Sequence, residues 1–203
     1  MSYLGTQPNN IVKNTGLYTP SEILQLEKDG NWGGSLELIQ EQTVSGVGTI
    51  DFTNIKENVY DVHFLSVSNY HTTTDSGRGV LRFYESGVLE SAGVYQVAEQ
   101  QGRADGVFSE VRSTTSTSLR YIISTGNATN ESGNAYCYIY NAGNSSKYTF
   151  MTYQTMSIQA IPQGIIAFGG GVLPQASLVD GFQISGTGIT ATAKLYGVKQ
   201  WVT

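Results

Sequence analysis

The stretch that decides the fold is Ile189-Thr-Ala-Thr-Ala-Lys-Leu-Tyr-Gly-Val198, near the end of the chain. Apolar and polar side chains alternate along it with a period of two, which is typical of a β-strand with one face on a core. The core set is Ala191, Ala193 and Leu195, and the opposite set is Thr190, Thr192, Lys194 and Tyr196. We therefore predict a strand whose second face meets solvent or a neighbouring molecule.

Runs of the same kind precede this strand and are separated by residues that favour turns, namely Gly, Asn, Ser and Thr. Their ranges are 35–39, 49–53, 59–67, 79–84, 119–123, 136–140, 148–158 and 178–184. In the second run Ile50 and Phe52 point inward. In the third, apolar residues occupy both faces, as expected of a central strand.

The predicted strands are joined by segments that we interpret as loops. Ser185-Gly-Thr-Gly188 suits a hairpin loop between the last two strands, because glycines supply positive φ angles. Residues 85–105 form a long loop region, and residues 154–172 are irregular enough to cross the top of the fold. Gly169-Gly-Gly171 has no Lys-Ser/Thr after it, so it is a flexible turn rather than a phosphate loop.

Composition supports an all-β class. The chain has 203 residues, of which only 13% are charged, with 24 glycines and 13 tyrosines. A chain of this length fits one all-β domain. We predict an antiparallel β-sandwich over residues 35–203, jelly-roll-like, with a barrel of another topology as the alternative.

Residues 1–34 are predicted to form an extended arm with one short helix, at about residues 19–29. Thr19-Pro-Ser-Glu22 combines an N-cap, a proline at the first helical position and a capping-box glutamate. A helix this short is marginal in water. We expect the arm to dock on another surface through its apolar residues, which are Leu17, Tyr18, Ile23, Leu24, Leu26 and Trp32.

Charge and sequence pattern exclude several functions. A net charge of −5 without a basic cluster disfavours nucleic-acid binding. No run reaches the ~20 apolar residues of a membrane span, and Met1-Ser-Tyr-Leu-Gly5 lacks signal-peptide character, so we expect synthesis in a cytosol without membrane insertion. Cys137, the single cysteine, allows no internal disulfide and is interpreted as a small buried hydrophobe.

Catalytic patterns are weak. His63 and His71 are the only histidines, and no nucleophile-elbow motif accompanies them. His71 and Asp75 are too few ligands for a metal site. Two carboxylate pairs, Glu85 with Glu90 and Asp105 with Glu110, leave a glycan-cleaving site as the remaining enzymatic alternative. We expect no catalytic residue, no metal and no cofactor.

Tyr136, Tyr138 and Tyr140 share one face of a predicted strand, opposite Cys137 and Ile139. Three interpretations stay open for this row: cross-strand packing within one sheet, contact between subunits, and recognition of a glycan.

Several segments resemble virion proteins of tailed bacteriophages, especially marine ones. They are Met1-Ser-Tyr-Leu-Gly5, Asn14-Thr-Gly-Leu-Tyr-Thr-Pro-Ser-Glu-Ile23, Gly30-Asn-Trp32, Ile50-Asp-Phe-Thr-Asn-Ile55, Tyr60-Asp-Val-His63 and Ala193-Lys-Leu-Tyr-Gly-Val-Lys199. The resemblance covers both ends and the first strands, and residues 70–175 are unmatched. Such virion proteins include tail-fibre-like, neck and capsid-surface components.

The resemblance implies a β-sandwich displayed on a phage particle as a homotrimer, with the arm as the attachment part. We expect a non-enzymatic, fibre-like or appendage subunit that binds other virion proteins, with a host surface glycan or receptor as a further partner. The alternative is a decoration or cement protein that stabilises the capsid. A glycan-binding or glycan-degrading enzyme is the third alternative.

Overall fold

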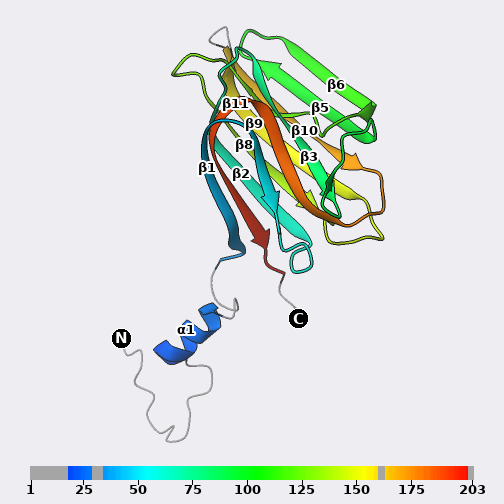
Figure 1. The fold of residues 1–203 in the computed structure, drawn as a ribbon. Helices are drawn as coiled ribbons and strands as arrows, with labels where there is room; N and C mark the ends of the chain where they lie inside the picture. The colour runs from blue at the N-terminus through cyan, green and yellow to red at the C-terminus, as the bar shows by residue number, and fades with distance from the viewer. Residues whose placement is uncertain (1–17, 29–33, 160–162, 201–203) are drawn as a thin grey trace, which may run out of the picture. The chain divides into compact units, whose positions relative to one another are not determined.

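The computed structural model describes residues 18–28, 34–159 and 163–200, which fall into two units, Met1–Ser35 and Leu36–Thr203. The first unit contains helix α1 (Pro20–Lys28) (Figure 1). It begins with the expected capping box. The Thr19 N–H donates to Glu22 Oε2 at 2.7 Å, and the Glu22 N–H donates to Thr19 Oγ1 at 3.2 Å. These bonds satisfy donors that the first turn leaves free, so the helix starts where the sequence predicts.

The second unit is built from antiparallel strands, which confirms the all-β prediction (Figure 1). They are β1 (Leu36–Thr53), β2 (Val62–His71), β3 (Gly77–Glu85), β4 (Val88–Leu89), β5 (Tyr95–Arg103), β6 (Phe108–Ser116), β7 (Tyr121–Thr125), β8 (Gly133–Tyr140), β9 (Thr149–Gln159), β10 (Gln163–Leu173) and β11 (Val179–Val198). Their order in the sheet is β4-β3-β11-β2-β8-β9-β10-β5-β6, with β1 also on β11 and β7 also on β3.

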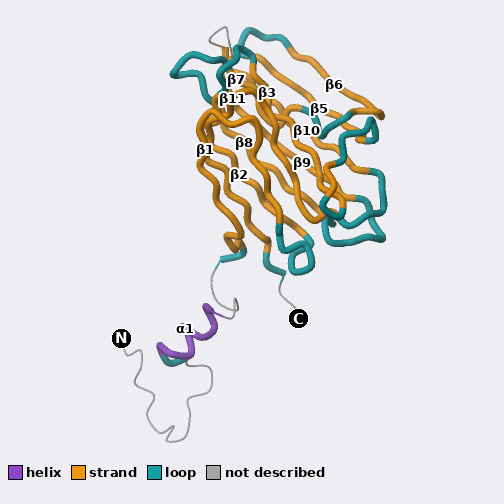
Figure 2. The backbone as a smooth tube through the Cα atoms, in the orientation of Figure 1, coloured by secondary structure: helices purple, strands orange, loops and turns teal. Residues whose placement is uncertain are grey.

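A long ribbon of β1 and β11 joins the two layers of this unit. The first part of β11 pairs with β3 and the second part pairs with β2, while β1 follows β11 through both parts. The sheet therefore curls (Figure 2), and β7, which pairs with β3, also lies close to β8 and β9. The result is a jelly-roll-like β-sandwich.

The predicted hairpin loop at 185–188 is wrong, because β11 runs through it without a break. A Cβ at Gly186 would lie 2.7 Å from Tyr70 Oη, and one at Gly188 would lie 2.2 Å from Thr73 Oγ1. Gly188 also has φ +60. The glycines here let a continuous strand bend from one layer to the other against close neighbours. Likewise the two strands predicted at 35–39 and 49–53 are parts of the single strand β1.

The loop predicted at 154–172 is also wrong: the segment contains the end of β9 and most of β10, which pair as neighbours. Gly169 to Gly171 are not a flexible turn, since they lie within β10 and pair on both sides. A Cβ at Gly169 would lie 2.4 Å from Ala98 O, and one at Gly170 would lie 2.5 Å from Met151 O. Close approach of β5 and β9 is what requires glycine here.

The long loop predicted at 85–105 is replaced by two strands, β4 and β5. Strand β5 reads Tyr95-Gln-Val-Ala-Glu-Gln-Gln-Gly-Arg103, and its polar composition explains the error. Polar side chains occupy both of its faces after Val97, which is unusual for a strand inside a sandwich.

The core lies between the layers and is rich in aromatic and branched side chains. Phe52 and Phe182 stack with ring centroids 4.9 Å apart. Cys137 is fully buried, as predicted, and burial raises the pKa of its thiol to about 12. His63 is fully buried too, with Nε2 2.8 Å from Ile55 O, and its burial lowers the pKa of the imidazole.

Candidate interaction surface

The outward side of β11, β2, β8, β9 and β10 collects aromatic and large apolar side chains. Residues paired across neighbouring strands lie on the same side of a sheet. Tyr196 pairs with Phe64, Phe64 with Tyr138, and Tyr138 with Thr152. The neighbouring rows add further members, and we call the set the outer aromatic face: Phe64, Tyr136, Tyr138, Tyr140, Phe150, Met156, Ile166, Phe168 and Tyr196.

The predicted tyrosine row forms part of this face. The Phe64 ring lies 5.0 Å from that of Tyr138 and 6.0 Å from that of Tyr196, centroid to centroid. Tyr138 also contacts Tyr136 and Tyr140. Such ring pairs stabilise a sheet and fix the orientation of the side chains. They explain why β2 can carry apolar residues on both faces: the outer Phe64 is covered by neighbouring rings.

Packing within the sheet leaves much of the face exposed. Met156 is 55% exposed, Phe168 53%, Phe150 44% and Tyr136 41%. The Tyr136 hydroxyl donates to Gln154 Oε1 at 2.6 Å, so even the polar tip of this ring is held in place. A continuous array of exposed large apolar side chains is characteristic of a surface that contacts another molecule.

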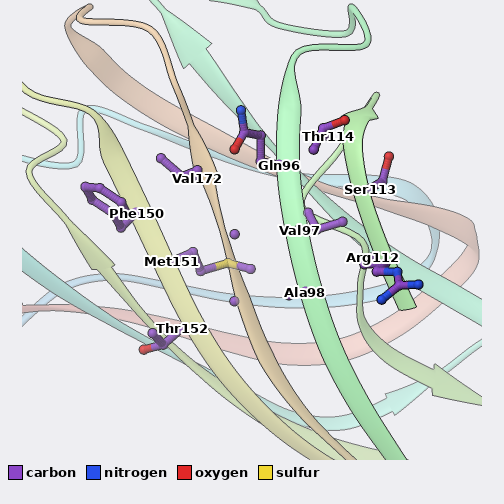
Figure 3. A pocket seen from close by; sticks show the side chains of 12 residues that line it. Gln96, Val97, Ala98, Arg112, Ser113, Thr114, Phe150, Met151, Thr152 and Val172 are labelled. Atoms are coloured by element: carbon purple, nitrogen blue, oxygen red, sulfur yellow. The ribbon is translucent and has the colours of Figure 1, made fainter. Parts of the chain in front are cut away.

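A groove crosses this outward side beside the glycines of β10 (Figure 3). Its volume is about 640 Å³, and Gly170 lies at its base. Figure 3 shows Phe150 and Thr152 on β9 at one wall, and Ala98 on β5 with Arg112 on β6 at the other. Because Gly170 has no side chain, its place in the row between Thr152 and Ala98 stays open to a partner's side chain.

Sequence reasoning found the tyrosines of this surface but missed its β9 and β10 members. Phe150 and Met156 were within a predicted strand, and their shared parity is a signal that the sequence does contain. Ile166 and Phe168 alternate with buried Ile165 and Ala167, but the loop assignment of 154–172 concealed that pattern. The register between β9 and β10 brings the four together.

In the arm, the predicted docking residues have mixed exposure. Tyr18 and Leu24 are exposed, and Ile23 and Leu26 are half-buried. Leu17 and Trp32 lie outside the described residues. The docking role of this set stays a prediction.

Each of the two histidines has a ring nitrogen within hydrogen-bond distance of a backbone carbonyl oxygen. His63 lies in the core, while His71 ends β2 with Nδ1 2.9 Å from Glu131 O. Across residues 18–28, 34–159 and 163–200, no group of three or more His, Cys, Asp or Glu side chains is placed to hold a metal ion.

The structure brings one predicted carboxylate pair together. Burial and the neighbouring Glu90 carboxyl raise the pKa of Glu85, which also accepts a hydrogen bond from Ser177 Oγ. A second carboxyl nearby disfavours the ionised form of Glu85, so the two groups lie close enough to interact. In the other pair, Asp105 binds Arg103 and Glu110 binds Arg112.

No helix in the described part of the chain is both long and apolar enough to span a membrane. No family model matches the sequence, and no curated protein or solved structure matches it either.

Proposed function

We propose that this protein is a non-enzymatic structural subunit of a bacteriophage virion, fibre-like or part of an appendage. In this proposal the arm, residues 1–34, docks on other virion proteins, and the sandwich assembles with copies of itself as a homotrimer. The observation that carries the proposal is the outer aromatic face: four of its side chains are 41–55% exposed in the single chain. Association of subunits removes such surface from water.

The arm supports the same proposal. Helix α1 is capped by its own residues and has an exposed Leu24, yet it spans only nine residues. Isolated helices shorter than about 12 residues are marginal in water. Contact between its apolar residues and another virion protein would stabilise it, which is the role that the resemblance to phage proteins assigns to the arm.

Deletion of residues 1–34 tests this function. We expect the truncated chain to keep the far-UV circular dichroism of a β-protein and to be missing from purified particles, while the full chain is incorporated. Leu24→Ser gives a finer test, because the side chain is exposed and its loss should reduce incorporation without unfolding the body. Incorporation of the truncated chain at the level of the full chain would refute arm docking.

A decoration subunit of the capsid is the second candidate, favoured by the breadth of the outer aromatic face, which spans five strands. Electron microscopy of particles that carry a labelled chain separates the two. Label at the tail or neck supports the appendage, and label at the symmetry axes of the shell supports the decoration protein.

A further inference from the structure

A second cavity lies on the inner side of β5, β9 and β10, opposite the outer aromatic face. Its lining includes Thr155 and Ser157, which alternate along β9 with the outward-facing Met156. From β5 it takes Gln101 and Arg103. The volume is about 180 Å³, which is small beside the roughly 300–1,000 Å³ of pockets for drug-sized ligands.

Three of the five arginines in the chain line this cavity: Arg78 on β3, Arg103 on β5 and Arg120 before β7. Glu99 is the one acidic residue in the lining. Three guanidinium groups against one carboxylate leave a charge of +2, and counting the nearby Asp105 reduces it to +1. In a protein with net charge −5, this concentration of positive charge is local to the cavity.

The polar groups of the cavity are held in place by hydrogen bonds. Arg103 Nη2 donates to Asp105 Oδ2 at 2.8 Å and to Gln163 Oε1 at 2.6 Å, whereas its buried Nε finds no acceptor among the described residues. The Tyr153 hydroxyl donates to Glu99 Oε2 at 2.6 Å. A guanidinium group that is held in one orientation and has an N–H without an acceptor can bind an oxyanion by charge-assisted hydrogen bonds.

We propose that this cavity binds a sugar residue that carries a carboxylate, such as the terminal residue of an acidic glycan. The arginines bind the carboxylate. Neutral polar side chains surround the arginines and can bond sugar hydroxyls, which both donate and accept hydrogen bonds. They are Gln101, Ser124, Thr155, Ser157 and Gln159.

Glu99 selects between kinds of anion. A dianionic phosphate meets repulsion from this carboxylate, whereas a singly charged sugar acid places its carboxylate on the arginines and a hydroxyl on Glu99. The small volume restricts the ligand to about one sugar residue. The cavity and the outer aromatic face are on opposite sides of the sheet, so binding and self-association do not compete.

The inference goes beyond the proposed structural role but rests on it for its biological meaning, because a host surface glycan is the further partner that the resemblance to virion proteins implies. The two can fail separately, because ligand binding is measured on the isolated full chain and incorporation is measured on particles.

Isothermal titration calorimetry of the full chain with glucuronate and glucose tests the proposal, since the two sugars differ at the carboxylate. We expect heat of binding with glucuronate and none with glucose. Arg78→Gln should weaken binding at least about tenfold, which is about 1.4 kcal/mol. Arg112→Gln, on the opposite side of the sheet, makes the same change of net charge and should leave affinity unchanged. Glu99→Gln should raise the affinity for phosphate relative to that for glucuronate, because it removes the charge that repels a dianion.

Equal binding of glucose, no binding of glucuronate, or equal loss in Arg78→Gln and Arg112→Gln would each overturn the proposal. Sulfate and phosphate are titrated in a separate experiment. If either binds as tightly as glucuronate, the cavity is an inorganic-anion site and the saccharide assignment is wrong. Arg78 is exposed, and the circular dichroism spectrum of Arg78→Gln, compared with that of the wild type, separates a loss of affinity from a loss of fold.

Discussion

Phe168→Ser should dissociate the proposed trimer while leaving the body folded. Phe168 is 53% exposed in the single chain, and a phenylalanine side chain buries roughly 200 Å² when fully covered, which leaves about 100 Å² for a partner. At about 25 cal/mol per Å² this area contributes about 2.5 kcal/mol per subunit, or a factor of about 70 in a dissociation constant. The value is an upper limit, because ordering of side chains at an interface offsets part of it.

Analytical ultracentrifugation over a range of protein concentrations measures the effect. Val88→Ser is the matched control: Val88 is 70% exposed but lies on β4, the terminal strand of the order, outside the five strands that carry the outer aromatic face. We expect the trimer in the wild type and in Val88→Ser, and smaller species in Phe168→Ser with an unchanged circular dichroism spectrum. A wild-type chain that sediments as a monomer at micromolar concentration would refute the reasoning, as would equal dissociation of the two variants.

Three further predictions concern the sandwich itself. Gly143→Ala should lower the free energy of unfolding by about 2 kcal/mol, because the new Cβ would lie 1.9 Å from Glu57 O. The control is Gly48→Ala, whose Cβ would have nothing within 4 Å and which should change the free energy of unfolding by less than about 1 kcal/mol. Urea unfolding measures both variants. Burial lowers the pKa of His63, so below about pH 6.5 the unfolded chain binds more protons than the folded chain. The thermal midpoint of unfolding should therefore fall as the pH drops through that value. In His63→Gln the midpoint should depend less on pH. The Cys137 thiol, with its pKa raised to about 12, should react with a thiol reagent at about pH 8 only after denaturation.

The strands that could be predicted from sequence are those in which a period of two coincides with the usual chemistry of the two faces. In the run at 49–53, Ile50 and Phe52 are buried as expected, and Ala191, Ala193 and Leu195 form the inner side of β11. The capping box of α1 was predictable because all its contacts lie within four residues. Local pattern was enough in each case.

Glycines produced the main errors, because the reason for a glycine is often a residue far away in the chain. At Gly188 it is Thr73, at Gly169 it is Ala98 and Glu99, and neither contact can be read from neighbouring residues. A turn and a close approach of strands require the same residue type. From the sequence alone, a bent strand and a glycine-rich strand are therefore both predicted to be loops.

Strands β9, β10 and β5 keep the period of a sandwich strand but partly invert its usual chemistry, since β9 and β10 carry large apolar side chains outward and β5 carries polar side chains inward. Phe150, Met156 and Phe168 point outward, whereas Gln101 and Arg103 point into the cavity. Exposed apolar groups and half-enclosed charges both reduce the stability of an isolated domain. Under the proposals made above, another subunit covers the apolar side chains on the outer side, and an anionic ligand compensates the positive charges on the inner side. The same inversion explains why this region was the hardest to predict and why both proposed binding surfaces lie there.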